Sequence, residues 1–321
     1  MKDLNERQLR LIQLLSDGEF HSGEQIGQEL GISRAAISQQ IKVIRQLGLD
    51  IYSLTGRGYC LKTPFQMMAP AKISEKVPDA PVHVQPLITS TNQVMMSDLN
   101  RWQRGECLLA EMQTAGRGRR GRQWFSPFGS QYIMSMFWQL EAGPAAAMGL
   151  SLAIGVSVVK SLEAMGYQSL GLKWPNDVYM EHRKLAGILV EMAATVGGAC
   201  QLVIGTGVNL RLPEEIIAAM DQPCAHLAEQ NIAIDRNELC ARMIRGLRDA
   251  LALFELSVLE PFLADWNRLD IFMEQPVKVI LGEQLIYGTY KGIDAQGNML
   301  LLTSEGLIQK FVGGEVSLRP A

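Results

Sequence analysis

Four arginines lie within a glycine-rich stretch of nine residues, which is the strongest chemical signal in the sequence. The stretch runs Gly116-Arg117-Gly118-Arg119-Arg120-Gly121-Arg122-Gln123-Trp124, and we call it the Gly-Arg loop. Guanidinium groups so close together repel one another unless an anion lies between them. Glycines also let backbone amides approach a ligand closely. We therefore predict a loop that captures a polyanion and becomes ordered on binding; a solvated or nucleic-acid-binding tract is the alternative.

Two common phosphate-binding motifs do not account for this loop. Gly116, Gly118 and Gly121 formally match the dinucleotide fingerprint G-x-G-x-x-G, but that motif opens a helix. Here the aromatic and proline residues of 124–127 follow, and no acidic ribose-binding residue is evident at the expected distance. The P-loop motif is excluded because Gly-Lys-Ser or Gly-Lys-Thr occurs nowhere in the chain.

Three further stretches place polar groups at the ends of short apolar runs. In Lys173-Trp174-Pro175-Asn176-Asp177 the proline ends a strand, and Asn176 and Asp177 can reach a ligand or magnesium, although Pro-Asn-Asp alone is an ordinary turn. Lys184 precedes the apolar strand 185–190, either as an edge residue with its charge in water or as a cation directed at a bound anion. Gly205-Thr206-Gly207-Val208-Asn209 ends a buried strand with small residues and an amide.

Short apolar runs alternate with helical stretches between residues 84 and 272, which predicts an α+β domain. Strands fit Cys107 to Glu111, Tyr132 to Trp138, Ile188 to Met192 and Leu202 to Val208. Helices fit 91–101, 145–164, 235–255 and about 258–268. Pro144 suits the first helical position of the second helix, and Gly166 suits the position just past its end.

The pattern changes to short strands with glycine turns from Gln275 onward. The strands fit Val277 to Leu281, Gln284 to Gly292, Asn298 to Thr303 and Leu307 to Phe311, which predicts a small β-barrel or sandwich. We predict four segments: a DNA-binding domain at 1–62, a linker with one short helix at 63–83, a catalytic domain at 84–272 and a small β domain at 273–321.

The first sixty residues have the pattern of a winged helix. Leucines and isoleucines recur at helical spacing in three stretches, and Ser22 and Ser33 suit the cap positions of the second and third helices. Two helices joined by a short turn containing Gly31 are typical of a helix-turn-helix. The segment 51–61, with its Thr55-Gly56-Arg57-Gly58 turn, predicts a hairpin after them.

Charge placement within this domain favours contact with DNA. Residues 33–62 carry five lysines and arginines against Asp50 alone, whereas residues 1–31 carry six acidic residues against three basic ones. The candidate DNA-binding residues are Ser33, Arg34, Ser38 and Gln39 on the third helix and Arg57 at the hairpin tip. A protein-interaction module with a solvated basic face is the alternative.

Composition limits the remaining function classes. The 321 residues suffice for two or three domains, and 47% hydrophobic and 20% charged residues are globular values. Five cysteines without Cys-x-x-Cys spacing and four scattered histidines imply neither a disulfide framework nor a zinc site. The N-terminus lacks the apolar core of a signal peptide, and the uncharged stretch 142–159 contains proline, glycine and serine. We therefore expect a cytoplasmic protein with no membrane contact.

The motifs in this order resemble those of biotin protein ligases. The matching residues are Ser90-Thr91-Asn92, Glu111-x-Gln113-x-Ala115 with the Gly-Arg loop, Lys173 to Asp177, Arg183 to Leu189, and Gly205-x-Gly207-x-Asn209. With the winged helix, the whole chain is similar to the bifunctional bacterial ligases that also repress the biotin operon. The resemblance implies a mixed α/β ligase domain like that of class II synthetases and a C-terminal SH3-like barrel.

The resemblance also implies the roles of individual residues. Lys184 and Arg119 would be catalytic. Biotin would contact Ser90, Thr91, Asn92, Gln113, Arg117, Gly118, Arg119, Lys184, Gly187, Leu189 and Gly205. ATP or the adenylate would contact Arg117, Arg122, Asn176, Asp177 and Asn209, with Asp177 as a magnesium ligand.

The implied reaction joins biotin and ATP, with Mg²⁺ as activator, to biotinyl-5′-adenylate, which a lysine of a biotin carboxyl carrier protein then attacks. Neither step needs an enzyme nucleophile, which fits the absence of a Ser-His or Cys-His constellation. No tightly bound metal is expected. The adenylate-bound form would be a homodimer that binds operator DNA, and acceptor docking would compete with dimerisation.

One departure and three alternatives accompany this resemblance. Repressor-type relatives often close an aromatic side chain over adenine from the segment corresponding to 210–234, but this chain has no Phe, Trp or Tyr there. The candidates for that contact are Leu212, Met220, Cys224 and His226. The alternatives are a lipoate-type ligase, a biotin-sensing regulator without catalysis, and a plain nucleic-acid-binding protein.

Overall fold

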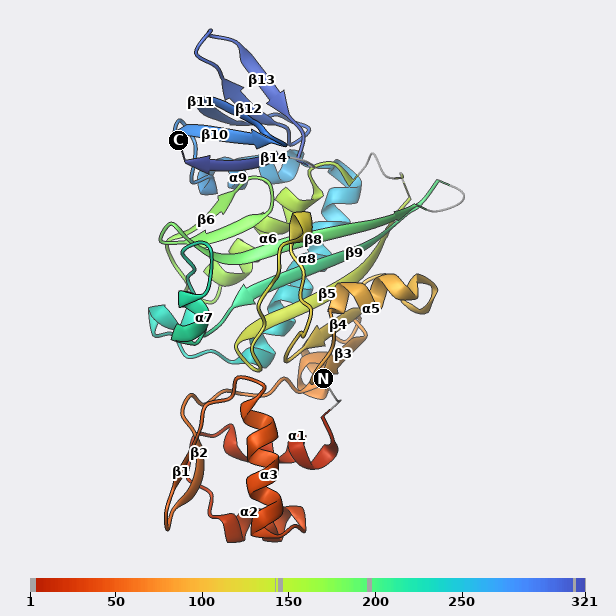
Figure 1. Ribbon diagram of the computed structural model, residues 1–321. Helices are drawn as coiled ribbons and strands as arrows, with labels where there is room; N and C mark the ends of the chain where they lie inside the picture. The colour runs from red at the N-terminus through yellow and green to blue at the C-terminus, as the bar shows by residue number, and fades with distance from the viewer. Residues whose placement is uncertain (1–3, 142, 144–146, 195–197, 314–315, 321) are drawn as a thin grey trace.

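The computed structural model describes residues 4–141, 143, 147–194, 198–313 and 316–320. Figure 1 shows three parts that follow one another along the chain. A helical domain with a hairpin is N-terminal, a seven-stranded sheet with its helices is central, and a five-stranded sheet is C-terminal.

The N-terminal part has the predicted three helices and hairpin. These are α1 (Glu6–Leu15), α2 (Gly23–Leu30), α3 (Arg34–Arg45), β1 (Ile51–Leu54) and β2 (Gly58–Leu61). Asn5, Ser22 and Ser33 cap the helices by accepting hydrogen bonds from backbone amides, which stabilises helices this short. Gly31 ends α2 in the left-handed region, at a φ of 63°. The buried face of α3 consists of Ile37, Ile41 and Ile44, as its spacing predicts.

The connection to the central part contains α4 (Pro70–Lys76), the expected short helix. Beneath it, Arg236 and Glu111 form an ion pair of 2.7 Å, with side chains 3% and 1% exposed. Met68 donates its amide proton to Glu111, and Arg236 donates to the carbonyl of Gln66. Two residues of the connection, Gln66 and Met68, are therefore hydrogen-bonded to a buried ion pair of the central part.

The central sheet has the strand order β3-β4-β5-β9-β8-β7-β6. Its strands are β3 (Val82–Gln85), β4 (Cys107–Ala110), β5 (Gln131–Leu140), β6 (Leu170–Lys173), β7 (Asp177–Met180), β8 (Arg183–Ala194) and β9 (Cys200–Asn209). Strands β3 and β4 are parallel, and the other neighbouring pairs are antiparallel. The apolar runs predict β4, β5, β8 and β9, and the strand expected to end before Pro175 is β6; the short strands β3 and β7 are not predicted.

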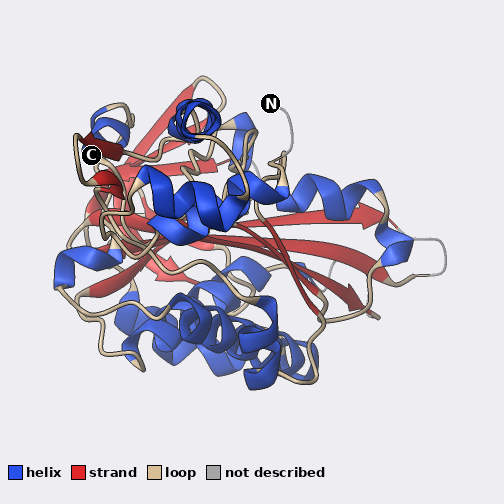
Figure 2. Cartoon of the chain, turned by 90° about the horizontal axis from the view of Figure 1, so that it is seen from below, coloured by secondary structure: helices blue, strands red, loops and turns tan. Residues whose placement is uncertain are grey.

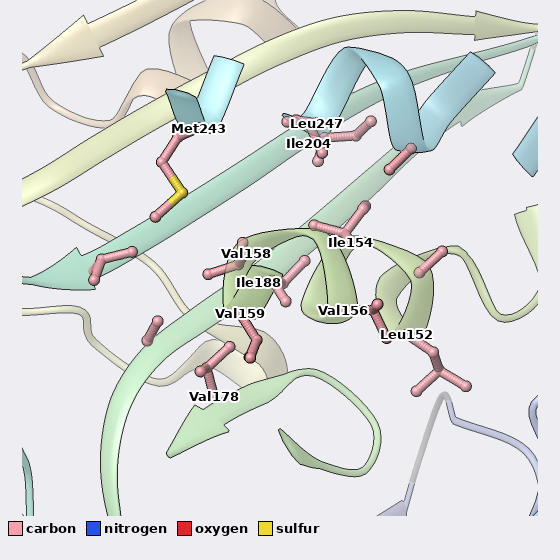
Figure 3. Packing of buried hydrophobic residues seen from close by; sticks show 14 of the residues in the cluster. Leu152, Ile154, Val156, Val158, Val159, Val178, Ile188, Ile204, Met243 and Leu247 are labelled. Atoms are coloured by element: carbon pink, nitrogen blue, oxygen red, sulfur yellow. The ribbon is translucent and has the colours of Figure 1, made fainter. Parts of the chain in front are cut away.

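Helices lie on both faces of this sheet (Figure 2). On one face, α6 (Leu150–Glu163) and α8 (Arg236–Ser257) pack against buried residues such as Ile188 and Ile204 (Figure 3). On the other face, α5 (Thr91–Ser97) packs Met95 against Phe137 and Val203. The remaining helical segments are η1 (Leu99–Arg101), η2 (Arg119–Gly121), α7 (Glu214–Ala218), η4 (Leu227–Gln230), η5 (Glu260–Phe262) and α9 (Leu263–Leu269).

Two predicted helices have different limits in the structure. The helix predicted at 145–164 begins only at Leu150, because Gly149 precedes it with a φ of 76°; residues 144–146, including Pro144, lie outside the described residues. The helix predicted at 91–101 is interrupted at Asp98, whose φ is −150°, and continues as the short η1. Among the described residues, no helix has both the length and the apolar character needed to cross a bilayer.

The C-terminal part is an antiparallel sheet in the order β13-β12-β11-β10-β14. Its strands are β10 (Pro276–Leu281), β11 (Gln284–Ile293), β12 (Met299–Leu302), β13 (Ile308–Phe311) and β14 (Val316–Pro320). The first four match the predicted strands, and β14 is an addition. Because β14 pairs with β10, the last residues of the chain return to the side of the sheet that faces the central part (Figure 1).

Candidate functional site

A cavity of about 900 Å³ lies on the central sheet, between the Gly-Arg loop, the start of α5, residues 219–224 and the C-terminal sheet. Its lining contains every residue predicted to bind a small molecule: Ser90, Thr91, Asn92, Gln113, Arg117, Gly118, Arg119, Arg122, Asn176, Asp177, Lys184, Gly187, Leu189, Gly205 and Asn209. The fold therefore brings together motifs that are more than one hundred residues apart in the sequence.

Part of the cavity lining consists of the neutral polar side chains of Thr91, Asn92 and Gln113, with Ser135 packed behind them. We call these four side chains the polar wall. Each of them is 8% exposed or less. The Thr91 amide donates to Gln113 Oε1 at 2.8 Å. The Ser135 hydroxyl lies 2.7 Å from Thr91 Oγ1 and 2.5 Å from Asn92 Oδ1. Ser135 comes from the middle of β5, and no sequence signal distinguishes it from a core serine.

The glycines of β8 and β9 make room for two larger side chains above the sheet. A Cβ on Gly205 would lie 2.4 Å from Asn92 Oδ1, and a Cβ on Gly207 would lie 2.8 Å from the Trp124 ring. A side chain at either position would therefore displace Asn92 or Trp124, which already fill the space. The Trp124 ring therefore lies directly on the strand backbone, which its place in the Gly-Arg loop did not predict.

A chain of buried amides continues from Trp124 to the segment 210–234. Trp124 Nε1 donates to Gln131 Oε1 at 3.0 Å, and Gln131 Nε2 donates to Asn209 Oδ1 at 2.7 Å. Asn209 Nδ2 in turn donates to the carbonyl of Ala225 at 3.0 Å. Asn209 therefore ties the edge of the cavity to the segment beyond it, and its amide is already engaged within the protein.

Lys184 and Asp177, which both line the cavity, form an ion pair. Lys184 Nζ lies 2.7 Å from Asp177 Oδ1, with both side chains 15% exposed. The same ammonium lies 5.8 Å from the centre of the Trp124 ring. The strand β7 carries Asp177 and pairs antiparallel with β8, which carries Lys184, so adjacent strands hold the two charges together.

Another part of the cavity lining collects cations, and we call it the cationic end. Its members are Arg119, Arg122, Lys173 and Arg319, all of which line the cavity. Arg119 donates to Asn176 Oδ1 at 3.0 Å and to the carbonyl of Gly313, and burial lowers its pKa while Asp177 opposes that shift. Burial and then Arg319 lower the pKa of Lys173 to about 8. So many cations around so few acidic groups favour a polyanionic ligand.

Comparisons with known proteins identify the family of this chain. The Bifunctional ligase/repressor BirA of Escherichia coli (strain K12) is 48% identical over 321 residues, which is 100% of this chain and 99% of that protein. The chain belongs to the family of bifunctional biotin ligase/repressors. BirA of Bacillus subtilis (strain 168) is 27% identical over 96% of this chain and 97% of its own length.

Three family models match successive parts of this ligase/repressor, and a solved structure matches three quarters of it. An HTH domain matches residues 7–60, the Biotin/lipoate A/B protein ligase family matches residues 84–209, and the Biotin protein ligase C terminal domain matches residues 272–319. The biotin protein ligase from Aquifex aeolicus in complex with biotin and ATP has a TM-score of 0.63 at 28% identity, covering 75% of this chain and 99% of that chain.

The segment 210–234 of this ligase/repressor covers the cavity without an aromatic side chain. Met220 and Cys224 line the cavity, whereas Leu212 and His226 are absent from its lining. The backbone contributes to the attachment of this segment, since Lys184 donates its amide proton to the Pro223 carbonyl and its carbonyl accepts from the Ala225 amide. Aromatic rings reach the cavity from other segments, including Trp124, Phe125 and Phe272.

The candidate DNA-binding residues lie in the winged helix, at the opposite end of the molecule from the C-terminal sheet (Figure 1). Arg34, Ser38 and Gln39 are exposed on α3, while the Ser33 hydroxyl caps that helix by accepting from the Ala36 amide at 3.3 Å. The Arg57 guanidinium lies 4.5 Å from the centre of the Phe20 ring. Arg34 on the exposed face of α3 and Arg57 in the hairpin thus place positive charge on the same domain.

Proposed function

We propose that the chain is an ATP-dependent biotin–protein ligase whose winged helix makes it a repressor as well. It joins biotin and ATP to biotinyl-5′-adenylate and pyrophosphate, and then transfers the biotinyl group to a lysine of a biotin carboxyl carrier domain. The observation that carries this proposal is one cavity with a neutral polar wall, a lysine and a cationic end. These three parts match a polar ring, a carboxylate and a triphosphate.

The first step brings two anions together, because a carboxylate oxygen of biotin attacks the α-phosphorus of ATP and pyrophosphate leaves. Lys184 lies where the carboxylate and the phosphates meet, and Arg119 and Arg122 extend the positive potential toward the phosphates. Such fixed charges stabilise the transition state without reorganising. Arg117, Asn176 and Asp177 complete the nucleotide side, and Asn209 holds the neighbouring segment in place through the Ala225 carbonyl.

The ring of biotin lies at the polar wall, with Ser90, Thr91, Asn92 and Gln113 as its neighbours. Gly118, Gly187, Leu189 and Gly205 line the passage for its apolar body. Gly205 and Asn209 are four residues apart on β9, or roughly 13 Å. Gly205 lies beside the polar wall and Asn209 lies toward Lys184. That length lets one extended biotin molecule reach from the polar wall to Lys184.

The residues fit a magnesium ion that arrives with the nucleotide. Asp177 and Asp221 are the carboxylates in the cavity lining. Among the described residues, no group of three His, Cys, Asp or Glu side chains could hold a metal ion. Mg²⁺ usually binds through one or two carboxylates together with substrate phosphates. Asp177 would hold the ion, which would supply further neutralisation of phosphate charge.

The repressor role depends on the winged helix and on assembly. Arg34, Ser38 and Gln39 contact base edges, Ser33 and Arg57 contact the backbone or minor groove, and the adenylate-bound chain binds operator DNA as a homodimer. Sedimentation with and without biotinyl-5′-adenylate tests the assembly. Equal dimerisation in both conditions would exclude control by the ligand.

The decisive experiment supplies the purified chain with biotin, ATP and Mg²⁺ and measures pyrophosphate release and the adenylate by mass spectrometry. A carrier domain is then added, with a variant in which arginine replaces its acceptor lysine as control. We expect adenylate formation and labelling of the lysine-containing carrier alone. Lipoate in place of biotin tests the second activity in the description of the matching family. Preferential activation of lipoate, or no mixed anhydride from either acid, would overturn the proposal.

A further inference from the structure

Glu191 lies just outside the cavity lining and connects two parts of the site. It is a partly buried residue of β8, and its Oε2 accepts from Asn92 Nδ2 at 2.8 Å. The same carboxylate accepts from Arg117 Nη2, at 3.0 Å for Oε1 and 3.2 Å for Oε2. One carboxylate therefore joins the polar wall to the first arginine of the Gly-Arg loop, 74 residues away along the chain.

On the side of the polar wall, the negative charge of Glu191 fixes the orientation of the Asn92 amide. Asn92 Nδ2 donates to Glu191 and, at 3.3 Å, to the carbonyl of Leu189, so both of its protons are engaged. The reversed amide would place Oδ1 against the carboxylate, which like partial charges disfavour. Asn92 Oδ1 is thereby directed at the Ser135 hydroxyl, 2.5 Å away.

The position of the Ser135 proton follows from this orientation. Asn92 Oδ1 can only accept, and a hydroxyl has one proton to donate, so Ser135 donates to Asn92 Oδ1. Thr91 Oγ1 lies 2.7 Å from the Ser135 hydroxyl and 3.1 Å from Gln113 Oε1, to which it donates. A charge outside the cavity thus fixes Asn92 and Ser135, which adjoin the Thr91 hydroxyl at the cavity lining.

On the side of the Gly-Arg loop, the same carboxylate neutralises one of four guanidinium groups. Arg117 is the first of them along the chain, and its side chain is 44% exposed. Its ion pair with Glu191 lowers the mutual repulsion within the loop and connects the loop to the rigid strand β8. Arg119 is held separately, by Asn176 and Gly313.

We propose that Glu191 is a positioning residue that prepares the polar wall for its ligand and keeps the Gly-Arg loop closed over the cavity. This inference rests on the proposed function, which supplies biotin as the ligand. Two separate effects follow from one carboxylate: selection of the ring of biotin, and slow release of the adenylate.

The test compares Glu191→Gln, Arg117→Met and the double variant with wild type. Glu191→Gln keeps the side-chain shape but removes the charge. Two properties are measured by direct binding, namely the Kd for biotin without ATP and the dissociation rate of biotinyl-5′-adenylate. The control is Glu181→Gln, which removes a carboxylate that is 58% exposed and pairs with Arg183 outside the cavity. Thermal unfolding confirms that each variant is folded.

We expect Glu191→Gln to weaken biotin binding and to speed adenylate release, each by roughly tenfold or more, since hydrogen bonds to charged groups are the strong ones. Arg117→Met should speed adenylate release to a similar extent, and it should weaken biotin binding less than Glu191→Gln does, because it leaves the hydrogen bond from Asn92 to Glu191 in place. In the double variant the effects on release should not add, because both substitutions break the same ion pair.

Two results would overturn the role of Glu191. One is wild-type biotin affinity and adenylate release in a folded Glu191→Gln variant; the other is fully additive effects on release. Both presuppose a wild-type chain that forms the adenylate. If wild type itself forms none, the proposed function fails instead, so the two failures are distinguishable.

Discussion

Gly207→Ala tests whether the Trp124 ring can pack on β9 only because residue 207 has no side chain. The new Cβ would lie 2.8 Å from two ring carbons and 3.0 Å from Nε1. Carbon atoms in good contact lie about 3.5 to 4.0 Å apart, so the ring must move by roughly 1 Å. Such a displacement stretches the 3.0 Å bond from Trp124 Nε1 to Gln131 beyond useful length.

The expected energies indicate that Gly207→Ala weakens ligand binding more than it destabilises the fold. Overpacking costs about 1 to 3 kcal/mol when the structure cannot yield, and the lost hydrogen bond costs about 0.5 to 1.5 kcal/mol. Alanine in a strand recovers about 0.5 to 1 kcal/mol relative to glycine. Trp124 is only partly buried and belongs to a loop, so its ring can move away from β9. We expect a fall in Tm of a few degrees at most, together with roughly tenfold weaker binding of biotin and adenylate.

Two further variants make the experiment quantitative. A Cβ on Gly187 would lie 3.3 Å from the same ring, so Gly187→Ala should have an intermediate effect. Gly23→Ala is the control, because its nearest neighbour is a side-chain carbon of Arg34 at 3.9 Å, in the winged helix. Calorimetry gives the affinities, and acrylamide quenching reports the exposure of Trp124, since the other four tryptophans are at most 7% exposed. Unchanged affinity and quenching in Gly207→Ala would refute the reasoning.

Four other outcomes are expected. Lys184→Met should slow pyrophosphate release by roughly 10² to 10³-fold, because no cation then neutralises the carboxylate; near wild-type rates would exclude that role. Arg119→Gly should release the adenylate faster, which streptavidin blots detect as biotin on bystander proteins, whereas a clean blot would contradict this assignment. Exchanging Arg34 and Arg57 for glutamate should abolish operator binding measured by anisotropy at fixed salt and leave pyrophosphate release unchanged. Burial lowers the pKa of Lys173 from 10.5 to about 8, so the unfolded chain binds more protons between these values and stability should rise with pH across that window. Urea unfolding of wild type and Lys173→Met at pH 7.5, 9 and 10 checks this, since the variant should lack that rise.

Local spacing was sufficient wherever a feature depends on neighbours in the chain. Residues close together in the sequence predict the caps at Ser22 and Ser33 and the hairpin turn. Continuous apolar runs in the same way predict the long strands β5 and β9. The motif residues also line one cavity in the structure. Short strands such as β7 have too few residues for a period to be visible, and β14 is a strand because β10 pairs with it.

Contacts between distant segments were not predictable in the same way. Ser135 is indistinguishable from a core serine until α5 places Asn92 beside it. Glu191 is an ordinary strand residue until the Gly-Arg loop folds back over β8. A period of two assigns a side chain to a face of the sheet, but it does not state what covers that face.

The contact between the winged helix and the central part is the clearest example of a contact that the sequence does not predict. A composition change near residue 62 suggests a boundary, yet Phe128, which follows the Gly-Arg loop by only four residues, is 3% exposed within the core of the winged helix. Its ring lies 6.0 Å from that of Phe65 in the connection. A chain cut at residue 62 would leave both rings without the core that covers them. The same short segment thus continues into the Gly-Arg loop on one side and into the core of the winged helix on the other. The two parts of the chain are in direct contact through Phe128, which no local spacing could indicate.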